Sequence, residues 1–133
     1  MKRLLTVGVF DTLHRGHIRL FERAKRYGDY LIVAVQTDEN IHKYKPQTRI
    51  INTTEERVYM VSSIKYVDEV ICYDNVDETV ERVDFDVFVR GEDQNHTGFQ
   101  RAIKWCKEHN KEVVTLTRTQ GISSTQIREV NDL

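Results

Sequence analysis

The sequence predicts an α/β protein in which five strands form one parallel sheet. Apolar runs of strand length alternate along the chain with segments whose apolar residues recur at helical spacing. The first strand, helix and second strand all fall within residues 4–35, which is the size of a βαβ unit. Such a unit requires parallel strands and a right-handed crossover. The strands are expected at 4–10, 30–35, 66–72, 85–89 and 112–117.

Helices are expected between these strands, with one polar loop. The first follows the strand at 4–10 and covers 18–27, and a capping box of Thr53 and Glu56 starts a second that runs to Ile64. Residues 74–82 form a weak helix and 99–109 a stronger one. The segment 40–52 is polar and basic and holds the only proline, so we expect a mobile loop there.

Composition bounds the class of protein. The chain has 133 residues, 31% charged and 39% hydrophobic, which fits a single soluble domain over 1–133. A net charge of −1 argues against nucleic-acid binding through bulk charge. No apolar run reaches the ~20 residues of a membrane span. The first residues lack a signal-peptide cleavage pattern, so a cytoplasmic location is expected. Both cysteines, Cys72 and Cys106, are expected to be buried and inert.

The stretch from the first strand into the first helix is the strongest functional signal. It reads Val7-Gly-Val-Phe-Asp-Thr-Leu-His-Arg-Gly-His17. Histidines three residues apart at a helix start can direct both rings at one point. That point lies where free N–H groups and the helix dipole attract an anion, and Gly16 allows close approach. The pattern predicts a phosphate site. A metal pair is the alternative, although no third histidine or cysteine lies nearby.

Two further segments are expected at the same sheet edge, because parallel strands present their carboxyl ends together. Lys43 and Lys45 lie in the basic loop after the second strand and could contact phosphate as a lid. Arg118 follows the fifth strand and leads into a helix with a capping box of Ser123 and Gln126. An arginine can bind phosphate oxygens with two parallel hydrogen bonds. Two helix N-termini could therefore share one polyphosphate.

The pair His14-Arg-Gly-His17 and Arg118-Thr-Gln-Gly-Ile-Ser-Ser-Thr125 resembles the small cytidylyltransferases, in particular those acting on glycerol 3-phosphate. The resemblance covers nearly the whole chain. It implies a Rossmann-like, doubly wound sheet, a homodimer and Mg²⁺ bound with the CTP phosphates. The implied reaction joins CTP and a small phosphorylated alcohol to give a CDP-alcohol and pyrophosphate.

The resemblance also implies roles for residues. His14 and His17 would stabilise charge on the α-phosphate, and Lys43 and Arg118 would join them as catalytic residues. Lys43 and Lys65 would bind the acceptor, and Asp93 would accept a hydrogen bond from the cytosine amino group. The implied nucleotide-binding residues are Val9, Phe10, Asp11, His14, Arg15, Gly16, His17, Lys45, Asp93, Arg118, Thr119, Gln120, Gly121, Ile122, Ser123, Ser124 and Thr125.

Departures from the family pattern leave the acceptor open. The glycerol-3-phosphate enzymes have Trp and Lys after the third strand, where this chain has Val76 and Thr79. The segment 94–108 is longer than in those enzymes, and 49–57 is similar to the heptose-phosphate adenylyltransferases. Glycerol 3-phosphate is the favoured acceptor. Phosphoethanolamine or phosphocholine, and adenylyl transfer to a sugar phosphate or flavin mononucleotide, are alternatives. A nucleotide-binding module without turnover is a further alternative.

Overall fold

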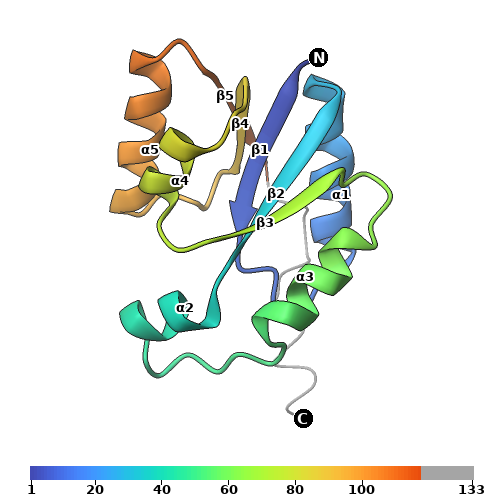
Figure 1. Ribbon diagram of the computed structural model, residues 1–133, viewed down its shortest axis with the longest axis vertical. Coiled ribbons are helices and arrows are strands. Elements are labelled where there is room, and N and C mark those ends of the chain that lie inside the picture. Colours follow the sequence, from blue (N-terminus) through green and yellow to red (C-terminus); the bar gives the residue numbers. More distant parts are fainter. Residues whose placement is uncertain (118–133) are drawn as a thin grey trace.

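The centre of the protein is a sheet of five parallel strands in the order β3-β2-β1-β4-β5 (Figure 1). The computed structural model describes residues 1–117. The strands are β1 (Arg3–Gly8), β2 (Tyr30–Gln36), β3 (Glu69–Tyr73), β4 (Val87–Gly91) and β5 (Glu112–Leu116). The helices are α1 (Arg15–Ala24), extended by the 3-10 turn η1 (Lys25–Tyr27), then α2 (Asp38–Tyr44), α3 (Thr54–Ser62), α4 (Val76–Arg82) and α5 (Thr97–Glu108). The predicted parallel five-stranded sheet is confirmed.

Helices cover both faces of this sheet, as a doubly wound fold requires. Phe21 and Ala24 of α1 and Val61 of α3 pack on one face, against strand residues such as Leu31 and Val33. On the other face, α4 and α5 contribute a second cluster that includes Val80, Phe99, Ala102 and Cys106. Figure 1 shows α1 and α3 on one side of the strands and α4 and α5 on the other. The central strands are therefore buried on both faces, which explains their continuous apolar sequence.

The strand register brings the carboxyl ends of the strands to one edge. Gly8 pairs with Val35, Gln36 with Tyr73, and Gly91 with Leu116. β1 lies between β2 and β4 in the sheet. The connection after β1 runs through α1 on one face, whereas the connection after β4 runs through α5 on the other face. This makes the gap between β1 and β4 a topological switch point, where open α/β sheets bind ligands.

The segment expected as a loop begins with a helix. Thr37 caps α2 by accepting a hydrogen bond from the N–H of Asn40 (3.2 Å), and Asp38 and Glu39 occupy its first turn, where acidic side chains favour the dipole. The helix ends at Tyr44 with Lys45 as its C-cap, because the residue before a proline is disfavoured in helical geometry. The prediction of a loop over 40–52 was therefore wrong for its first five residues.

The two cysteines differ in exposure. Cys106 is buried, and burial raises the pKa of its thiol to about 11, as expected of an inert core thiol. Cys72, by contrast, is exposed, because β3 is an edge strand and has an open face at this position. The prediction of burial is correct for Cys106 and wrong for Cys72.

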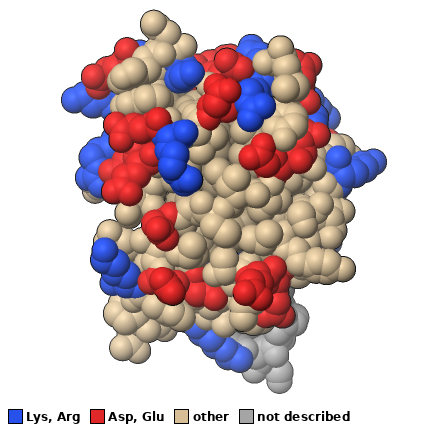
Figure 2. Space-filling view, in the orientation of Figure 1, with Lys and Arg blue, Asp and Glu red and all other residues tan. Residues whose placement is uncertain are grey.

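The surface carries no strong bias of charge on the face drawn in Figure 2, where acidic and basic side chains alternate around an uncharged area. Counts over the whole sequence agree, with 20 Lys and Arg against 21 Asp and Glu. Among residues 1–117, no helix combines the length and the apolar character that crossing a membrane requires.

Candidate active site

The loop that leaves β1 has an unusual backbone. Phe10 and Thr12 have φ angles of 56° and 49°, in the left-handed region that residues other than glycine rarely adopt. Such strain costs on the order of 1–3 kcal/mol and is found where a site needs a defined geometry. Phe10 is buried, with its ring edge-on to His17 at a centroid distance of 5.6 Å and 5.3 Å from the ring centroid of Phe21. These contacts fix the loop against α1.

The two histidines form a reciprocal cap at the start of α1. His14 is the N-cap residue, and its Nδ1 accepts a hydrogen bond from the N–H of Gly16 (3.0 Å). The N–H of His14 in turn donates to Nδ1 of His17 (3.2 Å). This is a capping box in which two imidazoles replace the usual hydroxyl and carboxylate. The rings stack at 4.0 Å between centroids, which confirms that they lie side by side.

These bonds determine which ring nitrogen carries the proton. A backbone N–H can only donate, so Nδ1 accepts in both rings and the proton lies on Nε2. Burial, and to a smaller extent the neighbouring His14, lowers the pKa of His17 to about 4. His17 is therefore neutral near pH 7 and donates through Nε2–H. At a helix N-terminus, this arrangement is suited to bind the oxygens of a phosphate group.

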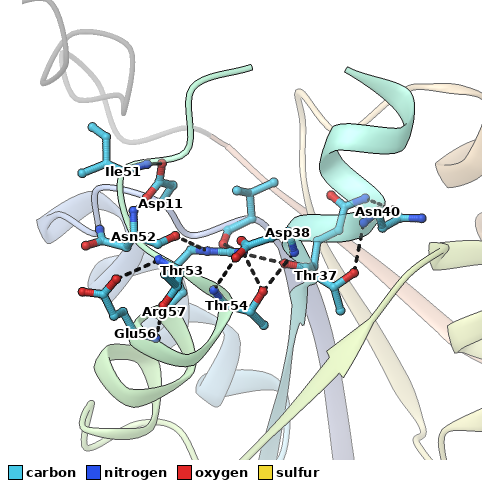
Figure 3. A network of polar contacts seen from close by, with 12 residues as sticks. Asp11, Thr37, Asp38, Asn40, Ile51, Asn52, Thr53, Thr54, Glu56 and Arg57 are labelled. Atoms are coloured by element: carbon cyan, nitrogen blue, oxygen red, sulfur yellow. Dashed lines mark hydrogen bonds and ion pairs between the residues drawn. The ribbon is translucent and has the colours of Figure 1, made fainter. Parts of the chain in front are cut away.

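Arg57 of α3 holds the carboxyl ends of β1 and β2 together. Its side chain is fully buried, yet its Nη1 donates to the carbonyls of Val9 (2.8 Å) and Gln36 (2.7 Å), and its Nε donates to that of Asn52 (3.1 Å). It also forms an ion pair with Asp38 at the start of α2. One guanidinium thus connects two strand ends and the starts of two helices, as Figure 3 shows in part.

Asp38 and Thr54 add a second connection between α2 and α3. The N–H of Asp38 donates to Oγ1 of Thr54 (2.9 Å), and the N–H of Thr54 donates to the Asp38 carboxylate (3.0 Å). Burial alone would raise the pKa of Asp38, but the bond from Thr54 and the Arg57 guanidinium outweigh it and lower that pKa. The carboxylate therefore stays charged, and the two helix starts are held in one arrangement (Figure 3).

Asp11, which the resemblance assigns to the nucleotide, also has a structural contact. Its buried carboxylate accepts hydrogen bonds from the N–H groups of Ile51 (2.8 Å) and Asn52 (2.9 Å). These bonds attach the segment before α3 to the loop after β1. Asp11 is thus a support of the site. The same segment carries the Asn52 carbonyl that Arg57 binds, so the two contacts reinforce each other.

Of the other predicted residues, those that the structure describes lie at the carboxyl edge, apart from Lys65. Val9, the exposed first residue of the loop after β1, and Arg15 and Gly16 in the first turn of α1 lie near the histidines in the chain. Lys43 lies in the last turn of α2, and Lys45 is its C-cap; both side chains are exposed. Asp93 follows β4 in an exposed turn. Arg118, Thr119, Gln120, Gly121, Ile122, Ser123, Ser124 and Thr125 lie outside the described residues.

Lys65 lies at the opposite end of the sheet from these residues. It lies between α3 and β3, at the amino end of β3, with its Nζ over the Tyr66 ring (5.1 Å). Its neighbours confirm that position, since Asp68 accepts from the N–H of Leu31 (2.8 Å) near the start of β2. The histidines lie at the carboxyl ends of the strands. The assignment of Lys65 to the acceptor therefore gains no support from the geometry of one chain.

The turn after β4 is fixed against β1 by a side chain that the sequence did not single out. Gln94 donates from Nε2 to the carbonyl of Val7 (2.9 Å) and accepts at Oε1 from the N–H of Gly91 (3.0 Å). Arg90 donates to the carbonyl of Gln94 (3.0 Å). These bonds hold Asp93 at the switch point between β1 and β4.

Sequence reasoning missed Arg57, Asp38 and Gln94 as site residues. The available signal was the position of Arg57 in a capped helix, four residues before Val61 and thus on the same inward face. A charged side chain that is buried there must be paired with other polar groups. No comparable signal marks Gln94, since its partner Val7 is a backbone carbonyl 87 residues away.

An α/β sheet with a helix start capped by two histidines beside its switch point is typical of nucleotide-binding proteins, and comparisons with known proteins specify the class. The profile described as Cytidylyltransferase-like matches residues 5–130. The glycerol-3-phosphate cytidylyltransferase of Bacillus subtilis (strain 168) is 43% identical, over 97% of this chain and 96% of its own. That of Staphylococcus aureus (strain NCTC 8325 / PS 47) is also 43% identical, over 97% and 94%.

Other relatives are named for a different product or pathway. The FAD synthase of Ferroglobus placidus is 41% identical, over 96% of this chain and 76% of its own. Among solved structures, the lipopolysaccharide core biosynthesis protein of Thermoplasma volcanium GSS1 superposes with a TM-score of 0.76 at 28% identity, covering 90% of this chain and 99% of the other. The chain belongs to the cytidylyltransferase-like family, and its Rossmann-like fold agrees with that of this neighbour.

Replacing Arg57 with Met should destabilise the protein by about 3–5 kcal/mol, because Asp38 and buried carbonyls would lose their partner. The measurement is equilibrium unfolding in urea. The control is Arg26→Met, which removes an exposed ion pair with Glu22 and should cost less than about 1 kcal/mol. An Arg57 variant as stable as this control would show that the guanidinium does not hold the strand ends.

The lowered pKa of His17 predicts a pH dependence of stability. The unfolded chain protonates this ring near its ordinary pKa of 6.5, whereas the folded chain does so only near 4. Stability should therefore fall as the pH falls from 6.5 towards 4. His17→Gln keeps an acceptor for the cap and removes this contribution. The midpoint of thermal unfolding should fall less with acid in the variant, and equal slopes would contradict the assignment.

Proposed function

We propose that this chain transfers CMP from CTP to glycerol 3-phosphate, giving a CDP-alcohol and pyrophosphate. The observation that carries the proposal is the histidine cap at the start of α1, in which Nδ1 of both rings accepts from the backbone and the proton lies on Nε2. The similarity to two glycerol-3-phosphate cytidylyltransferases over nearly their whole length supports this nucleotide and acceptor. Adenylyl transfer to flavin mononucleotide or a sugar phosphate is the alternative, and the similarity to FAD synthase supports the transfer to flavin mononucleotide.

The proposed reaction is an in-line displacement. A phosphate oxygen of the acceptor attacks the α-phosphorus of CTP and forms the new P–O bond, while the bond to the bridging oxygen of pyrophosphate breaks. The attacking oxygen is already anionic, so no protein base or nucleophile is needed. Charge increases on the α-phosphate oxygens, and Nε2–H groups of His14 and His17 stabilise it. As in other phosphoryl transfers, positioning and electrostatics supply the rate.

The remaining groups would complete this site. Lys43 would bind the acceptor phosphate and Lys45 the CTP phosphates, since both extend from the end of α2 beside the edge. Asp93 would accept from the cytosine amino group, a contact that uracil with its carbonyl could not make. Arg118 and the residues after it would hold the triphosphate. These assignments follow the family pattern and are consistent with the placement of the described residues.

Mg²⁺ would enter with the CTP phosphates. This ion usually keeps several waters and binds through substrate phosphates with one or two carboxylates. Within residues 1–117, the structure gathers no group of three His, Cys, Asp or Glu side chains that could hold a metal ion. A site in which the triphosphate is the main ligand is compatible with that arrangement. A homodimer and a cytoplasmic location are also proposed, on the family resemblance.

Pyrophosphate release tests the proposal. CTP and ATP are each combined with glycerol 3-phosphate, phosphoethanolamine, phosphocholine, a sugar phosphate and flavin mononucleotide. CTP with glycerol 3-phosphate should give the highest kcat/KM. Turnover confined to ATP would replace the proposal with the alternative, and nucleotide binding without turnover across the whole panel would indicate a binding module.

The same assay separates catalysis from folding at the histidines. His14→Asn and His17→Gln each retain an oxygen that can cap α1 but lose the Nε2–H donor. Each should lower kcat by on the order of 10²–10³ with little change in CTP affinity, because the donor acts on charge that develops in the transition state. Near-normal turnover of either variant would show that its ring does not act on the α-phosphate.

A further inference from the structure

Tyr73, the last residue of β3, has a polar atom that the described residues leave unused. The residue is only 6% exposed, and its ring packs in the core cluster with Val76 and Phe99. Within residues 1–117, its hydroxyl makes no hydrogen bond, and it is not among the fully enclosed polar atoms that lack a partner, so it is open to solvent. As the last residue of β3, paired with Gln36, Tyr73 lies at the carboxyl edge of the sheet.

Asn40, in the first turn of α2, offers a second unused group on the same face. It too is 6% exposed, and its Oδ1 accepts from Nε2 of Gln36. Gln36 and Tyr73 are partners in adjacent parallel strands, so their side chains leave the same face of the sheet. Asn40 thus lies over the face on which Tyr73 is buried. Its Nδ2 has no partner among the described residues and is not fully enclosed, so it too is open to a ligand.

His96 closes the group from α5. It caps this helix as His14 caps α1, with Nδ1 accepting from the N–H of Gly98 (3.0 Å), so that its proton lies on Nε2. Its ring is edge-on to Phe99 at 4.6 Å. A side chain at Gly98 would come within 2.9 Å of His96 and 3.4 Å of Val76, so the ring and Val76 flank this glycine. Val76 belongs to the cluster that holds Tyr73.

We propose that Tyr73, Asn40 and His96 form a subsite at the carboxyl edge of the sheet that binds the hydroxyl groups of a phosphorylated polyol. The inference rests on the proposed function and assigns the recognition of the acceptor's hydroxyl groups to these three residues. A phenol, an amide and an imidazole can donate to or accept from hydroxyls without a charge. A site built to hydrogen-bond a substrate hydroxyl discriminates strongly against an analogue that lacks it, because its buried groups then remain unpaired.

The charges around the subsite favour a polyol over an amino-alcohol. Burial, then the charges of Lys45 and Arg101, lower the pKa of His96, and Asp77 opposes them. Asp77 is engaged by Nε of Arg101 (2.9 Å), and Asp74 accepts from the Thr37 hydroxyl (2.8 Å). The charges of Asp77 and Arg101 thus compensate each other, and Lys45 would repel an ammonium group. The acceptor phosphate, by contrast, would be attracted.

Deoxy acceptors test the subsite. The kcat/KM is measured with CTP and glycerol 3-phosphate, and with the two propanediol phosphates that each lack one of its free hydroxyls. Wild type should prefer glycerol 3-phosphate by about tenfold or more over at least one analogue, as expected for one lost hydrogen bond that leaves a buried group unpaired. Tyr73→Phe, which removes only the oxygen, should abolish most of that preference while the KM for CTP stays unchanged.

Two further variants separate recognition from folding. His96→Asn keeps a good N-cap and should also reduce the preference. Tyr30→Phe is the matched control, since its hydroxyl bonds Glu69 at the amino end of β2 and β3; it should leave the preference intact. An unchanged preference in both Tyr73→Phe and His96→Asn would overturn the subsite. A fall in the kcat/KM of these variants by the same factor with all three acceptors would overturn it as well. Wild type that releases no pyrophosphate from CTP with any phospho-alcohol would instead overturn the proposed function.

Discussion

The carboxyl edge of the sheet depends on one buried guanidinium. Arg57 binds the Val9 carbonyl just after β1, the last carbonyl of β2, the Asn52 carbonyl before α3 and the Asp38 carboxylate in the first turn of α2. A charge without solvent must be satisfied by fixed partners, and those partners must in turn hold their places. Because Arg57 comes from α3 and its partners come from three other segments, the edge can form only when the helices and strands have assembled. The strained loop at Phe10 is stable for the same reason.

In the proposed reaction, that fixed edge would let the histidines act without a catalytic base. The loop after β1 presents the start of α1 in one orientation, and the reciprocal cap uses Nδ1 of both rings for the backbone. The proton of each ring therefore lies on Nε2, and His17 is neutral because burial opposes its charge. Donors that are already oriented need no rearrangement when charge develops on a phosphate. Under the proposed function, the cap would be both a structural contact of α1 and the source of the transition-state contacts.

The sequence was sufficient for the strands, the parallel sheet and the position of His14 and His17. These features follow from local patterns, namely apolar runs, helical spacing and a cap after a strand. The sequence was insufficient where a residue's position depends on contacts with segments that are distant along the chain. The bonds that the Asp11 carboxylate accepts from the N–H groups of Ile51 and Asn52, 40 and 41 residues away, have no local sequence signal. Helix α2 was hidden by its polar composition, although Thr37 supplied a capping signal.

Lys65 and Tyr73 both show that the sequence alone does not place residues at the correct end of the sheet. Lys65 was placed at the acceptor by motif alone, yet it lies at the amino end of β3. Tyr73 attracted no attention as the end of an apolar run, yet the register with Gln36 puts it beside α2 at the carboxyl edge. Which end of a strand a residue occupies, and which neighbour shares its face, depends on pairing that one sequence does not display.

The protonation of the two cap histidines tests the central claim most directly. Two-bond ¹H–¹⁵N correlation spectra of protein labelled with ¹⁵N-histidine distinguish the tautomers, and His14→Asn and His17→Gln assign the signals. Near pH 7, both rings should carry the proton on Nε2 and have an unprotonated Nδ1, and His17 should stay neutral as the pH falls to about 5, above its lowered pKa. A protonated Nδ1 in either ring, or a cationic His17 at pH 7, would contradict the account.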